Sequence, residues 1–331
     1  MERTLDEVKI FIKAGDGGRG CDSRLRISEK KFLNTGGEGG AGGSVTVRAD
    51  RNVTNLREFL YHPHFRAKSG GMGGSNHKRG KKGRDIVISV PSGTVVYRKD
   101  KSFLIRDLVE AGDEVIVLKG GRGGAGNAGG RFAQPGEAGG SLEIVLIFKI
   151  PADVFLIGLP NTGKSKLLNR LTHAHAREES FPFSTRHPEL GTHETSDYRQ
   201  ILLCELPALY RESHAGRGLG VDYLKHLDRG KIILLVLDPL NAFAGTLGEG
   251  YDILLETLRR YRPSLLEIPR AVVVNKMDLE EVRERVEAEK FRPADPLFLI
   301  SAETGEGVEG LMHFVTASLK KTETPKELSH G

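Results

Sequence analysis

Glycine is concentrated in one half of the chain, and its spacing restricts the fold more than any other feature of the sequence. Residues 1–150 contain 28 of the 42 glycines, in clusters at residues 14–20, 35–43, 69–74, 119–130 and 135–140. In two clusters a Gly-Gly pair recurs every third residue, beginning at Gly36, Gly39 and Gly42, and again at Gly70 and Gly73. Three residues per turn is the period of a polyproline II helix, and closely packed helices of this type need glycine at each inward position.

The glycine clusters alternate with short apolar segments that are typical of β-strands. A glycine-rich composition alone would also fit a disordered low-complexity region. Six segments rich in β-branched residues argue against disorder; they lie at residues 7–13, 43–49, 84–91, 93–98, 113–119 and 142–150. We therefore expect residues 1–150 to form an ordered, glycine-rich all-β domain.

From residue 151 the sequence alternates between patterns of buried strands and helices. The segment "ADVFLIGLPNTGKSKLLNRL" predicts a strand, a loop and a helix. Continuous apolar runs, which suit strands covered on both faces of a parallel sheet, occupy residues 200–206, 231–238, 270–276 and 296–302. Helical patterns lie at 250–261 and 280–291. This alternation predicts a doubly wound α/β domain over residues 151–320, followed by a polar tail at 321–331.

Charge and cysteine content indicate a cytoplasmic protein with a basic first half. Residues 1–150 hold 26 Lys and Arg against 17 Asp and Glu, a balance of +9, whereas the remainder holds 23 against 27, a balance of −4. The first half is therefore the better candidate to bind a polyanion such as nucleic acid. Two cysteines, Cys21 and Cys204, are too few for a disulfide framework and fit a reducing compartment. The charged start is not a signal peptide, and we expect no membrane span because no apolar run is long enough.

The motif G-x-x-x-x-G-K-S predicts a phosphate-binding loop between the first strand and helix of the second half. Backbone N–H groups of such a loop point at the α- and β-phosphates of a nucleotide, and the helix N-terminus favours negative charge. Lys164 can bridge the β- and γ-phosphates as a catalytic residue, and the Ser165 hydroxyl can bind Mg²⁺. The predicted nucleotide contacts are Gly158, Leu159, Pro160, Asn161, Thr162, Gly163, Lys164 and Ser165.

Two further strands of the second half end in residues that suit recognition of guanine. Asn275, Lys276, Met277 and Asp278 directly follow the strand "AVVV". The Asp278 carboxylate can accept hydrogen bonds from the ring N–H and the exocyclic amine of guanine, which adenine cannot offer. Ser301, Ala302 and Glu303 follow the next strand, where backbone N–H groups could meet the guanine oxygen. An ordinary turn would explain either segment alone, so the prediction rests on their combination.

The segment 180–191, "SFPFSTRHPELG", is the candidate for a loop that responds to the γ-phosphate. A threonine in such a loop can complete the coordination shell of Mg²⁺ when the γ-phosphate is present. Thr185 is our candidate for this metal-binding and catalytic role, although the spacing fits an ordinary proline-containing connection equally well. The neighbouring candidate nucleotide contacts are Phe183, Ser184, Arg186 and His187.

Taken in order along the chain, these motifs resemble the Obg family of bacterial GTPases. The resemblance covers nearly the whole chain and is carried by "DEVKIFIKAGDGGRGC", "GGEGGAGGSV", "KGGRGGAGN", "GLPNTGKS", "PFST", "NKMD" and "ISAETGEG". It implies a small β-barrel that extends polyproline-type helices, followed by a Ras-like G domain. It also implies Mg²⁺ and GTP or GDP as ligands and a role in assembly of the large ribosomal subunit. Many members carry a third, C-terminal domain; we expect this chain to lack it, together with any regulation that it supplies.

The resemblance suggests a partner for the basic first half. Residues 76–85, "NHKRGKKGRD", place Lys78, Arg79, Lys81, Lys82 and Arg84 among flexible glycines. A solvated loop is the ordinary explanation of such a charge run. Together with the +9 balance and the resemblance, we instead predict contact with ribosomal RNA phosphates. We expect the chain itself to be a monomer.

The sequence departs from the family at the element that senses the γ-phosphate. The family pattern Asp-x-Pro-Gly corresponds here to Glu205, Leu206, Pro207 and Ala208. Glu205 keeps the negative charge but adds a methylene, and the Ala208 side chain forbids the positive φ angles that glycine reaches freely. The next position, Leu209, is apolar, as it is in the family, where hydrolysis is slow. Some relatives with an asparagine at the position of Asn161 recruit K⁺, so K⁺ is a further cofactor candidate.

Two hypotheses of function therefore stand side by side. The first is a slow, Mg²⁺-dependent GTPase that acts in biogenesis of the large ribosomal subunit. The alternative is a catalytically impaired protein, a pseudo-GTPase, which binds guanine nucleotide as a structural ligand and scaffolds on RNA. Glu205 and Ala208 are the residues that support the alternative.

Overall fold

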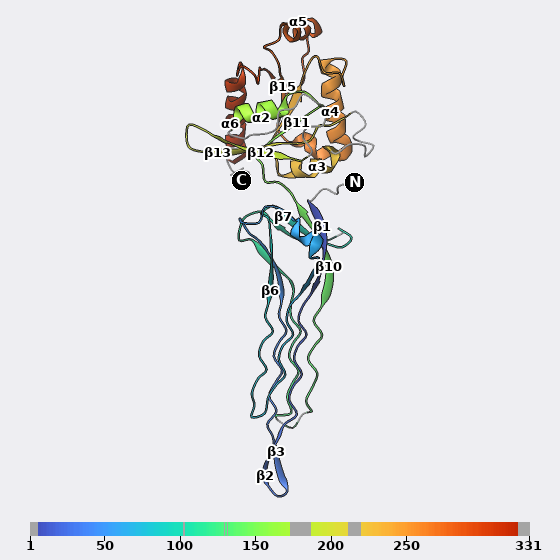
Figure 1. Cartoon of the computed structure of the whole chain (residues 1–331), viewed down its shortest axis with the longest axis vertical. Coiled ribbons are helices and arrows are strands. Elements are labelled where there is room, and N and C mark those ends of the chain that lie inside the picture. Colours follow the sequence, from blue (N-terminus) through green and yellow to red (C-terminus); the bar gives the residue numbers. More distant parts are fainter. Residues whose placement is uncertain are drawn as a thin grey trace, which may run out of the picture. The chain divides into compact units, whose positions relative to one another are not determined.

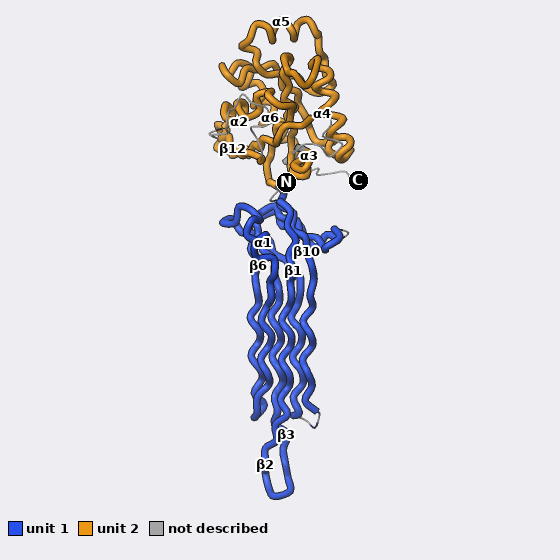
Figure 2. Tube along the Cα trace, turned by 45° about the vertical axis from the view of Figure 1, so that its right-hand side comes forward, with its two compact units in different colours: residues 1–149 blue, residues 150–331 orange. Residues whose placement is uncertain are grey.

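The chain forms two compact units, Met1–Lys149 and Ile150–Gly331 (Figure 2). The computed structural model describes residues 6–101, 103–128, 130, 132–172, 187–210 and 220–323. Each unit has a hydrophobic core of its own.

Unit 1 contains two sheets that enclose one core. The five-stranded sheet has the order β5-β1-β10-β7-β8 and the three-stranded sheet the order β6-β4-β9. The strands of the first are β5 (His64–Arg66), β1 (Glu7–Lys13), β10 (Ser141–Phe148), β7 (Thr94–Arg98) and β8 (Leu104–Leu108). Those of the second are β6 (Ile86–Val90), β4 (Val45–Ala49) and β9 (Glu114–Leu118).

The alternation of side chains along the strands builds this core. On β1, Val8, Ile10 and Ile12 are buried, whereas Lys9 and Phe11 face solvent. Buried residues of β4, β6, β7 and β10 join the same cluster, so the sheets pack by their apolar faces. This arrangement confirms the predicted all-β fold of the first half, and all six predicted strands are present within a few residues.

Between the strands, extended segments run side by side away from the sheets, as the wavy lines of Figure 1 show. We call them the glycine bundle; they comprise residues 14–21, 36–43, 67–74, 78–85, 120–127 and 134–140. The N–H groups of Gly37, Gly40 and Gly43 donate at 2.9 Å to carbonyls of one neighbouring segment, and Gly39 and Gly42 donate to another. Each three-residue turn thus presents N–H groups to its neighbours, which confirms the predicted polyproline-type helices.

The basic segment 76–85 belongs largely to this bundle, which corrects our expectation of a flexible loop. Gly80 and Gly83 donate backbone hydrogen bonds of 2.8 Å to the carbonyls of Glu38 and Ala41. The inward positions are therefore fixed, and the basic side chains are exposed. Four features of unit 1 were not predicted: the strands β5 and β8, the short helix α1 (Glu58–Tyr61), and a hairpin of β2 (Arg24–Ser28) and β3 (Lys31–Asn34) at the far end of the bundle (Figure 1).

Unit 2 is a six-stranded sheet with helices on both faces. The strand order is β12-β13-β11-β14-β15-β16, and all neighbours pair in parallel except β12 with β13. The strands are β12 (Glu189–Glu194), β13 (Gln200–Glu205), β11 (Val154–Gly158), β14 (Ile232–Leu237), β15 (Arg270–Val274) and β16 (Leu297–Leu299). The helices are α2 (Lys164–Leu171), α3 (Gly220–Tyr223), η2 (Leu224–Arg229), α4 (Leu247–Tyr261), η3 (Pro263–Glu267), α5 (Glu280–Glu289) and α6 (Val308–Glu323).

Helices α2 and α6 cover one face of this sheet, and their leucines pack on β11, β13 and β14. Helix α4 lies on the other side (Figure 1) and buries Leu247, Leu254 and Leu258. The predicted doubly wound domain is confirmed, but the sequence reasoning missed β12 and α6 and the short helices α3, η2 and η3. No described helix is long and apolar enough to cross a membrane. Because the parallel strands share one direction, their carboxyl ends meet at one edge of the sheet, where ligands of such folds bind.

Candidate nucleotide-binding site

The predicted phosphate-binding loop connects the carboxyl end of β11 to the first turn of α2. Asn161 and Gly163 adopt left-handed backbone conformations, with φ angles of 62° and 83°. Successive turns of this kind point backbone N–H groups into a concavity that suits an anion. A Cβ atom on Gly163 would lie 2.3 Å from the Asn275 amide nitrogen, so only glycine fits this position.

Lys164 lies inside the loop and is almost fully buried, with 5% of its surface exposed. Its ammonium donates hydrogen bonds to the carbonyl oxygens of Leu159 at 2.9 Å and Gly158 at 3.3 Å. Burial lowers the pKa of Lys164, and the nearby Glu205 carboxylate partly opposes this effect. The loop therefore positions a cation where the phosphates of a nucleotide would lie.

Glu205 is the second charged group beside the loop. It ends β13, is 1% exposed, and accepts a hydrogen bond of 2.9 Å from the Ser165 hydroxyl. The chain then turns back toward the loop, because Leu206 and Leu209 donate backbone hydrogen bonds of 3.1 Å to the carbonyls of Leu156 and Gly158. Glu205, one of the two departures from the family pattern, thus contacts the helix start beside the predicted phosphate-binding loop.

Asn275 connects three loops at this edge of the sheet: the predicted phosphate-binding loop, its own loop after β15, and the loop after β16. Its amide nitrogen donates to the Thr162 carbonyl at 3.0 Å, and its amide oxygen accepts from the Ala302 N–H at 2.9 Å. The next residue, Lys276, has a φ of 69°, and its ammonium lies 2.6 Å from the buried Asp238 carboxylate. The residues that the sequence placed on separate strands therefore meet in one site.

Ser301 orients the carboxylate that we predicted to read guanine. The fully buried Ser301 hydroxyl donates to Asp278 at 2.6 Å and accepts from the Thr304 N–H at 3.1 Å. These hydrogen bonds orient the Asp278 carboxylate. Preorganised groups of this kind reduce the entropy lost on binding.

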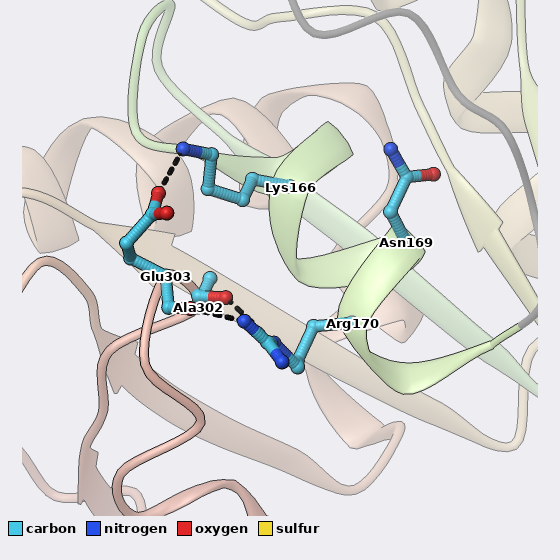
Figure 3. A pocket seen from close by; sticks show the side chains of 5 residues that line it. All are labelled: Lys166, Asn169, Arg170, Ala302 and Glu303. Carbon is cyan, nitrogen blue, oxygen red and sulfur yellow. Dashed lines mark hydrogen bonds and ion pairs between the residues drawn. The ribbon is translucent and has the colours of Figure 1, made fainter.

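A pocket of about 270 Å³ opens between α2 and the loop after β16 (Figure 3). Lys166 forms an ion pair with Glu303, and Arg170 donates to the Ala302 carbonyl at 2.9 Å and to the Glu303 carbonyl. Asn169 lines the pocket from the same helix. The helix that begins at the phosphate-binding loop therefore also braces the loop beside Asp278.

Three supporting residues escaped the sequence reasoning. Asn241 is buried and donates to the Pro160 carbonyl at 2.6 Å, Asp238 holds Lys276, and Arg170 holds the loop of residues 301–303. A signal for the first two was present, because "DPLN" directly follows the apolar run of β14. Polar residues at the carboxyl end of a central parallel strand are candidates for a site.

The predicted γ-phosphate-responsive loop is only partly described. Phe183, Ser184, Thr185 and Arg186 lie outside the described residues, and their roles stay predictions. His187 is described, and its ring nitrogen Nδ1 lies 3.1 Å from the hydroxyl of Tyr223, which follows the second undescribed segment.

This fold, in which the predicted phosphate-binding loop is joined to the loop predicted to read guanine, is that of a P-loop G domain. Residues 5–150 match the family model described as GTP1/OBG, and residues 153–276 match the model described as 50S ribosome-binding GTPase. GTPase Obg of Chlorobaculum tepidum is 39% identical over 319 residues, covering 93% of each chain. GTPase Obg of Bacillus licheniformis is 37% identical over 334 residues, covering 96% of this chain and 77% of the relative. The chain belongs to the Obg family of GTPases.

Proposed function

We propose that this chain is a Mg²⁺-dependent, slow GTPase that acts in the cytoplasm in biogenesis of the large ribosomal subunit. The observation that carries the proposal is the meeting of the phosphate-binding loop, Glu205 and Asp278 at one edge of the sheet, with Asn275 bonded to two of the loops. Asp278 then selects guanine, and Lys164 contacts the phosphates.

The residues beside the loop fit a magnesium ion. Mg²⁺ prefers an octahedron of oxygens. The Ser165 hydroxyl would hold the ion, beside the Glu205 carboxylate to which it donates a hydrogen bond of 2.9 Å. A bound Mg²⁺ neutralises charge that develops on the phosphates. Thr185 remains our candidate for a further ligand.

The chain's own residues would contribute mainly positioning and charge. Lys164 neutralises the β- and γ-phosphates, and loop N–H groups hold them in line. Leu209, at the position where other GTPases orient a water molecule, is fully buried and apolar, and this supports slow hydrolysis. Asn161, at the start of the loop's left-handed turn, is our candidate for helping to hold K⁺.

For the ribosomal partner we propose the basic side chains of residues 76–85, which are presented outward by the glycine bundle. Lys82 is 2.7 Å from Asp85 and Arg79 is 3.8 Å from Glu38, and such exposed pairs exchange readily for phosphate contacts. We propose that the protein acts as a monomer. Cys21 and Cys204 are free thiols, and this is compatible with the cytoplasm.

A single-turnover GTP hydrolysis assay with K⁺ and purified large subunits tests the proposal. We expect hydrolysis well above the uncatalysed rate. The double variant Glu205→Asp with Ala208→Gly should be faster by about tenfold, the equivalent of one recovered hydrogen bond in the transition state. The alternative function, a pseudo-GTPase, is favoured by Glu205 and Ala208. It would be supported if the wild type bound nucleotide tightly while its hydrolysis stayed at the uncatalysed rate.

A further inference from the structure

The outer face of the five-stranded sheet in unit 1 carries a stacked ring pair beside two cations. Strands β1 and β5 pair in parallel, which places Phe11 beside His64 and Lys13 beside Arg66. The rings of Phe11 and His64 are stacked, with centroids 5.0 Å apart and planes inclined by 19°. All four residues lie on the face opposite to the core, because Ile10 and Ile12 point inward.

A hollow of about 420 Å³ lies over this face, and 46% of the Phe11 surface is exposed. A volume of this size falls in the range of small-molecule sites. The hollow is formed by β1, β5 and the start of β10, and its lining includes Phe11, Lys13, His64, Arg66 and Glu143.

The charges around the hollow do not cancel. Lys13 and Arg66 lie directly opposite each other on neighbouring strands, an arrangement of like charges that destabilises a sheet. One carboxylate, Asp16, faces both at 3.8 and 3.6 Å, and it also accepts a hydrogen bond of 2.8 Å from the Gly139 N–H. Glu143 is 2.6 Å from the ammonium of Lys99 and neutralises that lysine instead. An excess of positive charge therefore lies beside an exposed aromatic ring.

We propose that this face binds one nucleotide unit of single-stranded RNA. The base stacks on the Phe11–His64 pair, and a phosphate lies between Lys13 and Arg66. An aromatic ring beside two cations can contact both the base and the phosphate of a nucleotide. Bases stack on aromatic side chains, and the phosphate backbone binds along positively charged surfaces. The proposal rests on the proposed ribosomal role, because ribosomal RNA would supply the strand, and it adds a base-stacking site to the phosphate contacts of residues 76–85.

The experiment uses the full chain and a short single-stranded RNA that carries a fluorescent end label and one internal 2-aminopurine. Anisotropy of the label gives the Kd, and quenching of 2-aminopurine reports stacking. Phe11→Leu should raise the Kd about fivefold to a hundredfold, since base stacking contributes about 1–3 kcal/mol, and should abolish the quenching. The matched control is Phe103→Leu, because Phe103 is also exposed in unit 1 but does not line the hollow; it should behave as wild type.

Two charge variants test the phosphate contact separately. Arg66→Gln should weaken binding and reduce the slope of log Kd against log salt by about 0.7, the value for one phosphate contact on a single strand. Asp16→Asn removes the competing carboxylate and should tighten binding. Phe11→Leu should leave the salt slope unchanged, because the ring carries no charge. Equal melting temperatures for wild type and Phe11→Leu exclude misfolding as the cause.

Several outcomes would overturn the proposal, and they are distinguishable. If Phe11→Leu bound and quenched like wild type, the base-stacking site would be wrong while the RNA role survived. Effective competition by free adenosine monophosphate would indicate a mononucleotide site instead of a strand site. If wild type did not bind RNA even at low salt, both this proposal and the RNA part of the proposed function would fail. GTP binding, measured on the same samples, tells whether the G domain is intact in each case.

Discussion

The glycine bundle of unit 1 and the nucleotide site of unit 2 are stabilised by different parts of the chain. In the bundle, backbone N–H groups bond to backbone carbonyls of neighbouring segments, as from Gly40 to Gly71 at 2.9 Å. In the nucleotide site, side chains connect the loops, as Asn275 does by bonding to Thr162 and Ala302. The bundle packs backbone against backbone at its inward glycines, whereas the site lies at the edge of a sheet that packs through its side chains.

This difference predicts which substitutions each region can accept. In the bundle the residue that matters is the one without a side chain, so adding atoms is harmful. In the site the residue that matters supplies a polar group, so removing atoms is harmful. Substitutions of both kinds can test the comparison. Those in the site should change the affinity for nucleotide, whereas those in the bundle should change the free energy of unfolding of unit 1.

The largest effect is expected for Asp278→Asn, which should reduce affinity for GTP and GDP at least a hundredfold. Two hydrogen bonds to a charged acceptor are lost, each with a contribution of about 1.5–3 kcal/mol. The melting temperature should remain close to that of wild type, since Asp278 is not part of the core. Isothermal titration calorimetry of nucleotide binding provides the measurement.

The same Asp278→Asn variant also offers a positive test, because xanthine carries a carbonyl where guanine carries its exocyclic amine. The new asparagine amide can donate to that carbonyl, so the variant should gain affinity for xanthosine nucleotides. Asp252→Asn, at an exposed position of α4, serves as the control and should change neither affinity. Unaltered guanine affinity in Asp278→Asn would remove this residue from the site.

A somewhat smaller effect, about 3 kcal/mol in the free energy of unfolding of unit 1, is expected for Gly73→Ala. Its new Cβ would lie 2.1 Å from the carbonyl oxygen of Gly37. The backbone cannot move away easily, because the Gly73 N–H is bonded to the Arg19 carbonyl at 2.9 Å. Urea unfolding followed by circular dichroism measures the loss, and hydrogen exchange localises it to the bundle.

The adjacent Gly74→Ala is the matched control for this substitution. Its Cβ would lie 3.3 Å from the Lys78 Cβ and 3.7 Å from the Lys78 carbonyl oxygen, which is a much milder contact than 2.1 Å. We therefore expect a clearly smaller loss of stability at the second glycine of the same pair. Equal effects at both positions would contradict the assignment of inward and outward glycines, and nucleotide binding should be unaffected by either variant.

The same contrast explains how far the sequence could predict the structure. The period of three in the glycines predicted the polyproline-type helices, because close packing leaves only glycine possible at inward positions such as Gly40. The apolar runs predicted the strands of unit 2, since continuous burial requires continuous hydrophobicity. Strand β12 was missed because its sequence, "ELGTHE", is polar and covers one edge of the sheet.

For the site, motif residues were predictable and their supports largely were not. Lys164, Asn275 and Asp278 belong to patterns with fixed spacing, and the fold brings them to one edge as expected. Arg170 contacts the loop of residues 301–303 through backbone carbonyls. Because every residue has a backbone carbonyl, the sequence does not show which residues accept such a hydrogen bond. The segment 76–85 was misjudged as a flexible loop because its partners, Glu38 and Ala41, are distant in sequence.

The smallest expected effect concerns pH and the junction between the glycine bundle and β6. Asp85 accepts hydrogen bonds of 2.7 Å from the Lys82 ammonium and from the Ser44 N–H, and in this order they lower the pKa of its carboxyl. Since the folded carboxyl binds a proton less readily than the unfolded one, its stabilising contribution is present above the unfolded pKa. It is lost as the pH falls through the lower folded pKa, below about 4.

Because 44% of the side chain is exposed, we expect a shift of only a few degrees in the melting temperature of unit 1. Asp85→Asn should be less stable than wild type at neutral pH, and the two should converge in acid; a constant difference would show that the carboxylate charge is not what stabilises the junction.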